Sequence, residues 1–514
     1  MGNAFAIAVN HPPKRKTTED GCEMPVLKVY EEGGRAAELT FVGVPLVAEV
    51  LAANGFYQAQ PCGGRGTCGK CAVRLTGAVA PETDAERRAG TRLACQARLL
   101  GDCEAVLPEK RDMRQIETGG EARVEALRPM AGRYGAAVDI GTTTLALRLY
   151  DLKTGEPLAK AGGINPQTAV AADVMGRIGA ALDGGLTRLQ RLVVDALNGL
   201  VNELCRAGKV APEELDVLTV TGNTTMLYLL TGQNPEALSH APFDADRLYG
   251  EWTTLLDRRA YLPRCMSAFV GADIACAVLA SGMCERAETA LLVDVGTNGE
   301  IALWHRGKLL CSSTAAGPAF EGSGIHMGVS SVPGAIDRVW VEAGALRCHT
   351  IGDAPAVGVC GSGLVDAVAA LLALGQIDET GAVEAEKLFL TPEVYLLGQD
   401  VRSVQLAKAA IAAGIRTMLE TAGLTAGDVA RLYVAGGFGS HLNFESATAI
   451  GLFPGEFAGR ERVIGNAALA GAGMLLLDES MAERAAALAH QAEHVPLGGS
   501  SRFSEHYMDE MMFE

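Results

Sequence analysis

The chain has 514 residues, 62 of them glycine, and 48% of its residues are hydrophobic, which predicts two or three domains with sizeable cores. Its formal net charge of −17 excludes nucleic acid as a partner, because phosphate binding needs clustered Lys and Arg side chains. No apolar stretch approaches the roughly 18 residues of a membrane span, and residues 1–10 lack a secretion signal, so we expect a cytoplasmic protein without a membrane partner.

The first predicted domain covers residues 25–108 and follows a polar leader over residues 1–24. Alternating apolar residues predict strands, and an apolar repeat that stops at Gly55 predicts a helix. A strand pair, this helix, a Gly-rich loop and a third strand are, in that order, typical of a small β-grasp domain. The strands are predicted at residues 26–30, 37–41 and 71–75, and the helix at residues 46–54.

Four cysteines in this domain have the spacing of a plant-type [2Fe–2S] site. Three of them share one loop and the fourth lies on a distant segment, so two thiolates can reach each iron. Glycines between them let backbone amides approach the cluster sulfurs. We therefore predict an electron-transfer protein whose metal ligands are spaced Cys62-x5-Cys68-x2-Cys71-x23-Cys95.

Two alternatives to this ligand set stay open on the spacing alone. Structural zinc sites pair two short Cys-x2-4-Cys knuckles, whereas the fourth cysteine here has no partner two residues away, which favours the iron–sulfur cluster over zinc. Cys103 competes with Cys95 as the closing ligand; we favour Cys95 because it follows a charged loop. The remaining cysteines are predicted to be buried thiols.

The second part of the chain contains two similar halves. A charged segment over residues 109–133 is the predicted linker, and strands alternate with helices from residue 134 onward. Residues 137–144 are matched by residues 292–299, and a Gly-Asn pair after a strand occurs at 222–223 and again at 465–466. Such duplication predicts two facing lobes with a ligand cleft between them. The lobes are predicted at residues 134–285 and 286–514.

The repeated turns have residues suited to binding phosphate and Mg²⁺. Each turn joins two strands, so neither a Walker A loop nor a Rossmann fingerprint is present. Their amides and hydroxyls can donate to phosphate oxygens, and the Asp at the strand end can hold Mg²⁺ through water. Gly436 and Gly437 follow another strand and could pack against a base and ribose. The two turns comprise Asp139, Gly141, Thr142, Thr143 and Thr144, and Asp294, Gly296, Thr297 and Asn298.

Taken together, these motifs resemble the superfamily of sugar kinases, actin and heat-shock chaperone ATPases, the ASKHA fold. That resemblance implies two ribonuclease H-like lobes that close on ATP, within an α/β multidomain chain. With its ferredoxin-type domain first, the whole sequence resembles the reductive activators of corrinoid proteins used with corrinoid-dependent methyltransferases. Further stretches that carry the resemblance are Asn165-Pro166-Gln167 and residues 172–178, 317–322 and 405–411.

The resemblance also implies roles for single residues. The two turns would hold the phosphates of ATP, and the Gly-Gly turn its adenosine. Asp139, Asp294 and Glu321 would be catalytic, with Glu321 orienting the hydrolytic water; a helix cap is the alternative role for Glu321. Because the ATPase motif begins soon after the linker, we expect the extra middle domain of some relatives to be absent.

The implied activity is the return of an inactive Co(II) corrinoid protein to Co(I) with one electron from the [2Fe–2S] cluster. A plant-type cluster lies near roughly −400 mV, and Co(I) is a stronger reductant. An uphill electron step costs about 2.3 kcal/mol per 100 mV, so ATP would have to supply the difference. The partners implied are the corrinoid protein and an upstream electron donor, and Ala- and Gly-rich C-terminal helices leave a homodimer open.

Two other activities stay open at this point. Activators of 2-hydroxyacyl-CoA dehydratases also join iron–sulfur chemistry to this ATPase fold, but their [4Fe–4S] cluster bridges two subunits and they have no separate ferredoxin unit. A small-molecule kinase with a ferredoxin-like module would need a general-base Asp beside its acceptor hydroxyl, and the sequence identifies none.

Overall fold

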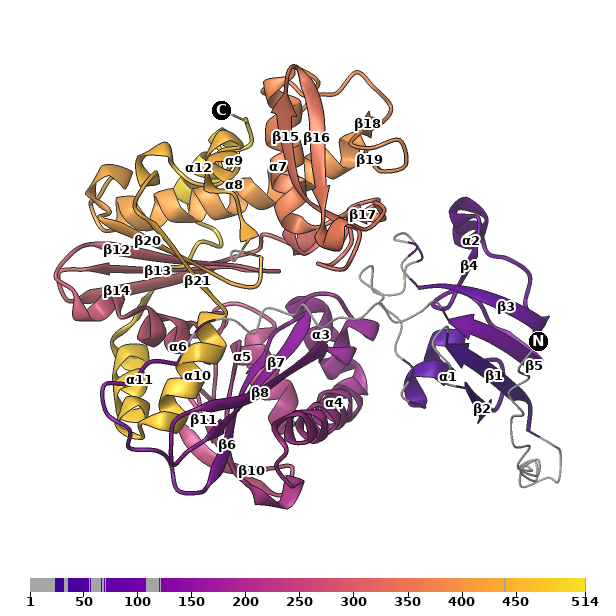
Figure 1. Cartoon of the computed structure of the whole chain (residues 1–514), viewed down its shortest axis with the longest axis horizontal. Helices are drawn as coiled ribbons and strands as arrows, with labels where there is room; N and C mark the ends of the chain where they lie inside the picture. The colour runs from indigo at the N-terminus through magenta and orange to yellow at the C-terminus, as the bar shows by residue number, and fades with distance from the viewer. Residues whose placement is uncertain are drawn as a thin grey trace, which may run out of the picture. The chain divides into compact units, whose positions relative to one another are not determined.

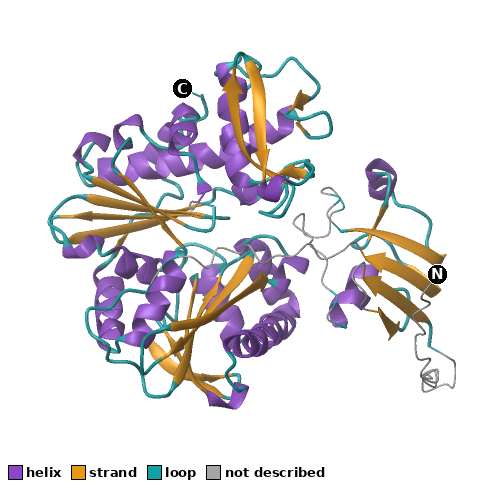
Figure 2. Ribbon diagram, viewed as in Figure 1, coloured by secondary structure: helices purple, strands orange, loops and turns teal. Residues whose placement is uncertain are grey.

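A computed structural model describes residues 24–31, 36–54, 56, 66, 69, 71–107, 120, 122–438 and 441–513. The chain divides into two compact units, Met1–Lys110 and Arg111–Glu514 (Figure 1). Both units combine helices with strands, as an α/β multidomain chain requires (Figure 2). Within the part of the chain that is described, no helix has the length and apolar character needed to cross a membrane.

The first unit is a five-stranded mixed sheet with one main core, and it confirms the predicted β-grasp arrangement. Its first two strands form an antiparallel pair, and the last strand runs parallel to the first in the middle of the sheet. The Gly33-Gly34 pair predicts a turn between the first two strands, and this turn lies outside the described residues. In the order β2-β1-β5-β3-β4 the strands are β1 (Val26–Glu31), β2 (Ala36–Thr40), β3 (Ala72–Val79), β4 (Arg92–Leu93) and β5 (Leu99–Leu107), with α1 (Val47–Ala53) and α2 (Asp84–Ala89).

The second unit contains two six-stranded sheets, β10-β11-β9-β6-β7-β8 and β21-β20-β12-β13-β14-β22, which share a five-stranded topology and differ in the edge to which the sixth strand, β10 or β22, is added. In each sheet three successive strands are antiparallel, and a later strand lies parallel to the first of them. This duplicated ribonuclease H-like topology confirms the ASKHA fold. The strands are β6 (Tyr134–Ile140), β7 (Thr144–Asp151), β8 (Pro157–Ile164), β9 (Leu215–Gly222), β10 (Glu251–Leu255), β11 (Arg258–Leu262), β12 (Ala290–Val295), β13 (Gly299–His305), β14 (Lys308–Thr314), β20 (Arg431–Ala435), β21 (Glu461–Gly465) and β22 (Glu493–His494).

The repeated Gly-Asn pairs are similar locally but do not hold equivalent places in the two sheets. Asn223 follows β9, which pairs with β6, whereas Asn466 follows β21, which lies one strand further from the corresponding β12. Both side chains cap a helix, by accepting from the amides of Met226 and Leu469. The similarity therefore reflects N-cap chemistry and not duplicated position.

Helices cover both sheets, and one layer of helices lies between them (Figure 1). The core between the sheets contains residues of α6, α10 and α11 together with residues of both sheets. A smaller sheet of β15, β16 and β17 packs on α7 in the second lobe. The bounds are α3 (Val174–Ala180), α4 (Leu186–Gly208), α5 (Thr224–Thr231), α6 (Ala272–Ser281), α7 (Gly361–Ala373), α8 (Gly398–Thr421), α9 (Phe444–Ala449), α10 (Ala467–Leu477), α11 (Ser480–Gln491), α12 (Ser501–Asp509), β15 (Ala335–Glu342), β16 (Ala345–Thr350), β17 (Gly358–Val359), β18 (Leu388–Phe389) and β19 (Tyr395–Leu396).

The closest approach in the middle layer is between α6 and α10. A Cβ atom at Gly471 would overlap the backbone carbonyl of Cys276, so only glycine permits this crossing. The distance between packed helices depends on the side chains at their contact, and small residues bring the backbones together. The Ala- and Gly-rich surface of α10 is thereby buried inside the chain, so this helix offers no surface to a homodimer.

The second half of the predicted linker packs on the second unit. The amides of Arg128 and Met130 donate to the carbonyls of Leu477 and Leu476 at 2.9 Å, at the end of α10. The side chain of Met130 is buried, and Val124 lies against the core between the sheets. Residues 122–133 contain no helix, so this segment is an extended strap and not a helical arm.

We expect Gly471→Ala to lower the free energy of unfolding by about 1–3 kcal/mol, because an added methyl group overpacks the α6–α10 crossing. The matched control is Gly199→Ala in α4, where a Cβ atom has open space; alanine favours the helix there and should stabilise it by up to about 1 kcal/mol. Urea unfolding followed by circular dichroism measures both changes. Equal stability of the two variants would contradict the role of Gly471.

Candidate functional site

A cleft with a volume of about 240 Å³ lies between the two lobes and brings together all the residues predicted for the nucleotide site. The two repeated turns face each other across it, since each turn follows the first strand of its lobe, β6 or β12. Ligands bind preferentially in such clefts. The predicted residues on its walls are Asp139, Gly141, Thr142, Thr143, Thr144, Asp294, Gly296, Thr297, Asn298, Glu321, Gly436 and Gly437.

The carboxylate of Glu321 joins the two turns. The Thr143 hydroxyl donates to its Oε2 at 2.5 Å, and the Thr297 hydroxyl lies 3.0 Å from both of its oxygens. The two hydroxyl oxygens are 3.1 Å apart. Glu321 ends a short 3-10 helix (Pro318–Glu321), and its carboxylate is held by the two turns. The geometry therefore favours a role in the cleft over a helix cap.

Further carboxylates crowd the floor of the cleft. Burial raises the pKa of Asp139 to about 6, although a 2.9 Å hydrogen bond from the Asn466 amide opposes the shift. Burial and repulsion from Asp139 raise the pKa of Asp294 to about 7 and that of Asp273 to about 8. Burial also raises the pKa of Glu300 well above its usual value. This concentration of negative charge suits a bound cation, although no three His, Cys, Asp or Glu side chains of the described residues form a preformed metal site.

The first turn is supported from behind by side chains outside it. The side-chain amide of Asn165 donates to the Gly141 carbonyl at 2.9 Å. The backbone amide of the same residue donates to the Thr143 carbonyl at 2.8 Å. The Asn223 amide donates to the Thr142 hydroxyl at 3.1 Å. The Asn-Pro-Gln stretch that carries the family resemblance thus fixes the shape of the turn.

The Gly-Gly turn packs against the second phosphate turn. Gly436 has a φ of +95°, and a Cβ atom there would lie 2.6 Å from Asp294 Oδ1. The glycine is therefore required by the protein's own packing against Asp294, independently of any bound base and ribose. The next residue but one, Phe438, stacks on Phe320 with ring centroids 5.1 Å apart and adds an aromatic wall to the cleft.

Several cleft residues were not predicted from the sequence. Asn466 and Asn223 belong to the repeated Gly-Asn pairs, which were interpreted only as a sign of duplication, although the repeat itself was a signal that could have found them. Asp273 and Glu300 carry no local signal, because each is a single acidic residue in a helix or strand whose side chain reaches the cleft only through the fold.

In the first unit, Cys71 and Cys95 lie side by side. The Cys71 thiol hydrogen-bonds to that of Cys95 and, against the effect of burial, lowers the pKa of Cys95 to about 7. The Ala94 amide donates to the Cys71 carbonyl at 2.8 Å, which joins the two segments. Adjacent buried thiols, one of them readily ionised, fit a cluster held by thiolates. Cys62 and Cys68 lie outside the described residues.

Cys103 has different partners. It lies on β5, and its thiol donates to the carbonyls of Ala78 at 3.0 Å and Gly101 at 3.1 Å. Burial raises its pKa, which disfavours the thiolate that a metal ligand must provide. The geometry therefore favours Cys95 over Cys103 as the closing ligand.

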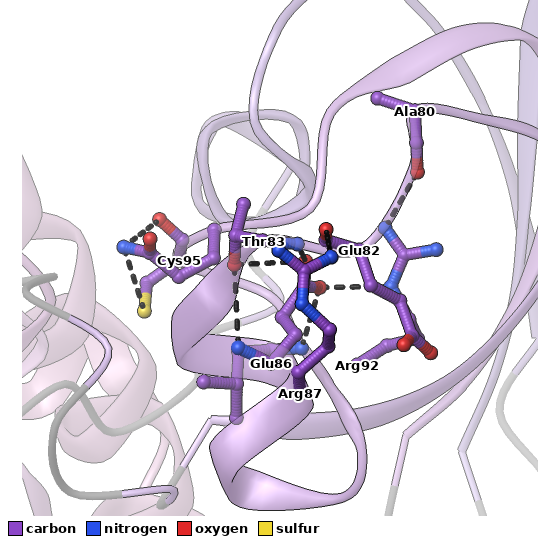
Figure 3. A network of polar contacts seen from close by, with 9 residues as sticks. Ala80, Glu82, Thr83, Glu86, Arg87, Arg92 and Cys95 are labelled. Atoms are coloured by element: carbon purple, nitrogen blue, oxygen red, sulfur yellow. Dashed lines mark hydrogen bonds and ion pairs between the residues drawn. The ribbon is translucent and has the colours of Figure 1, made fainter.

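A polar network fixes the segment that leads to Cys95 (Figure 3). Glu86 of α2, whose side chain is fully buried, accepts from the Arg92 guanidinium at 2.8 Å and from the Leu93 amide at 3.1 Å. It also accepts from the Thr83 amide at 2.9 Å, as in a capping box. The backbone two residues before Cys95 is thereby held in place.

We expect Cys95→Ala to abolish the [2Fe–2S] cluster and Cys103→Ala to retain it, because only Cys95 lies beside Cys71. Iron content and the visible absorption spectrum after anaerobic reconstitution measure this difference. Retention of two irons per chain by Cys95→Ala would exclude Cys95 as a ligand.

We expect Asp273→Asn to raise the thermal midpoint of the nucleotide-free protein more at pH 8 than at pH 5. The pKa of Asp273 in the folded chain is about 8, above the ordinary value of about 3.9. Stability is therefore lost as pH rises between these values, since the folded chain binds the proton more tightly. The Asn side chain of the variant does not ionise, so the variant does not lose this stability as the pH rises. Equal gains at both pH values, measured by scanning calorimetry, would contradict a raised pKa at Asp273.

Comparison with known families covers most of the chain. Residues 288–514 match the C-terminal domain of RACo, the ASKHA domain, and residues 134–286 match the RACo middle region. Residues 32–100 match the 2Fe-2S iron–sulfur cluster binding domain. The expectation that a middle domain is absent is therefore wrong, because the middle region of the family is the first lobe.

Named relatives are similar to most of the chain. The corrinoid activation enzyme RamQ of Eubacterium limosum is 33% identical over 74% of this chain and 70% of its own length. The [Co(II) methylated amine-specific corrinoid protein] reductase of Methanosarcina barkeri is 26% identical over 74% of this chain and 77% of its own. A solved reductive activator for corrinoid, iron-sulfur protein superposes with a TM-score of 0.71 at 26% identity, covering 95% of this chain and 98% of that one. This chain belongs to the RACo family, the reductive activators of corrinoid proteins that join a ferredoxin-type [2Fe–2S] domain to an ASKHA-type ATPase domain.

Proposed function

We propose that this chain uses ATP to return the inactive Co(II) corrinoid protein of a methyltransferase system to Co(I), one electron at a time. The observation that carries the proposal is the presence, in one chain, of a thiol pair fit for a [2Fe–2S] cluster and a cleft lined by two phosphate turns. The relatives, a corrinoid activation enzyme and a Co(II) corrinoid protein reductase, support the corrinoid target.

The residues of the first unit would hold and orient the electron carrier. When bound, the cluster supplies one-electron transfer. Cys71 and Cys95 would provide two of its four thiolate ligands, together with Cys62 and Cys68. The Glu86 network would keep the Cys95 segment fixed while the charge on the site changes.

The second unit would supply the energy for the uphill step. An electron passed from about −400 mV to a stronger reductant needs about 2.3 kcal/mol for each 100 mV. A ligand shifts an equilibrium only by its different affinity for the two states. Glu321 accepts hydrogen bonds from Thr143 and Thr297, the same hydroxyls that ATP phosphates would need. ATP binding would therefore displace Glu321 and change how the lobes are held together, and the freed carboxylate would orient the hydrolytic water.

The carboxylates on the cleft floor would hold Mg²⁺ with the nucleotide. Mg²⁺ prefers oxygen ligands and keeps several of its waters, so a cluster of Asp139, Asp273 and Asp294 without a closed cage suits it. Its charge would offset the burial and the repulsion from Asp139 that raise the pKa of Asp273 and of Asp294.

We expect the reduced wild-type protein to convert a purified Co(II) corrinoid protein to Co(I) with Mg-ATP and to do so poorly without it. Asp139→Ala should slow this conversion at least tenfold, because the first turn loses its carboxylate. The matched control is Asp195→Ala, an exposed residue of α4, which should behave as wild type. The growth of Co(I) absorbance under anaerobic conditions measures the rate. Reduction by Asp139→Ala at the wild-type rate and extent would refute the role of the nucleotide cleft.

The iron content of the purified protein tests the alternative activity. Four irons per dimer, in place of two per chain, would favour an activator of a 2-hydroxyacyl-CoA dehydratase.

A further inference from the structure

A fully buried arginine lies behind the first phosphate turn. Arg177 of α3 has no exposed surface, and its guanidinium reaches four acceptors in the described structure. It donates to the Thr142 carbonyl at 2.5 Å, the Ala171 carbonyl at 3.0 Å, the Gln167 side-chain oxygen at 3.3 Å and the Met226 sulfur at 3.1 Å. Three segments that are separate in the sequence, the first turn, residues 167–177 and α5, therefore meet at one side chain.

None of these acceptors carries a charge, which is unusual for a buried cation. A buried charge without a charged partner is strongly disfavoured. Burial accordingly lowers the pKa of Arg177 to about 9, while the negative charges of Asp173 and Glu321 oppose that shift. The guanidinium thus keeps a positive charge that its direct partners do not neutralise, on the far side of the turn from the cleft.

The contact with Thr142 also sets the direction of the next amide. A peptide group is planar and trans, so its C=O and N–H point in opposite directions. Because the Thr142 carbonyl points back to Arg177, the Thr143 amide points the other way, and Thr143 lines the cleft. The Asn165–Gly141 contact does the same for the Thr142 amide. Successive amides oriented in this way form a concave site for anions.

We propose that Arg177 is a positioning residue for the phosphates of ATP: it orients the amides of the first turn toward the cleft and places behind them a positive charge that none of its hydrogen-bond acceptors neutralises. This inference rests on the proposed function, since it assumes that the cleft binds ATP. It accounts for the stretch around residues 172–178, which carries the family resemblance and contributes no side chain to the cleft wall.

Two variants separate the parts of this role. Arg177→Gln keeps a hydrogen-bond donor but removes the charge, and Arg177→Lys keeps the charge but lacks the planar fork that serves several acceptors. The matched control is Lys408→Met, which removes another fully buried cation. Lys408 lies in α8 of the second lobe and donates to the Met512 carbonyl, so its loss should lower stability without changing the cleft.

The experiment measures the dissociation constant of Mg-ATP by calorimetry and, separately, the thermal midpoint without nucleotide. We expect Arg177→Gln to weaken ATP binding at least tenfold and Arg177→Lys to lie between it and wild type. Lys408→Met should lower the thermal midpoint but leave ATP affinity within twofold. A purely structural role for Arg177 would make its variants resemble this control.

A folded Arg177→Gln protein that binds ATP within twofold of wild type would overturn the inference. If that variant does not fold, Arg177→Lys decides: it must bind ATP at least threefold more weakly than wild type, and unchanged affinity overturns the inference. Failure of the wild-type protein itself to bind ATP would instead refute the proposed function. The two failures are therefore distinguishable in the same titration series.

Discussion

The crossing of α6 and α10 is the constraint on which the cleft depends. Both helices begin at the cleft, with Asp273 in the first turn of α6 and Asn466 as the cap of α10. Gly471 allows their backbones to touch, and this contact sets how far apart the two sheets lie. The hydroxyls of Thr143 and Thr297 reach one carboxylate only at that spacing. Small residues between the two sheets thus determine the distance between the two turns that line the cleft.

Features encoded by short stretches of sequence were predictable. The strand–turn–strand repeats, the β-grasp order and the cysteine spacing depend on neighbours within a few residues, and the structure places the turns on opposite walls of one cleft. The choice between Cys95 and Cys103 was not decided by spacing. It depends on which residue the turn after β4 places beside Cys71, and on the carbonyls that Cys103 meets on β5.

Features that depend on distant partners were not predictable. The hydrogen bond from Asn466 to Asp139 joins residues 327 positions apart, and nothing local to Arg177 indicates that it reaches the Thr142 carbonyl. The requirement for glycine at position 436 likewise comes from Asp294 on another strand. Since an acidic or amide residue at a strand or helix end occurs for many reasons, only the assembled fold distinguishes the members of this site.

The position of α10 also has a consequence for synthesis of the chain. One face of the first-lobe sheet, including Ala137 and Val217, is covered by Leu469 and Leu476 of α10. A lobe that begins at β6 therefore cannot complete its core until the ribosome has passed residue 477. Its apolar face stays open meanwhile, which slows folding and invites aggregation. We infer that the first lobe cannot mature until most of the second lobe, which separates it from α10 in the sequence, has been translated.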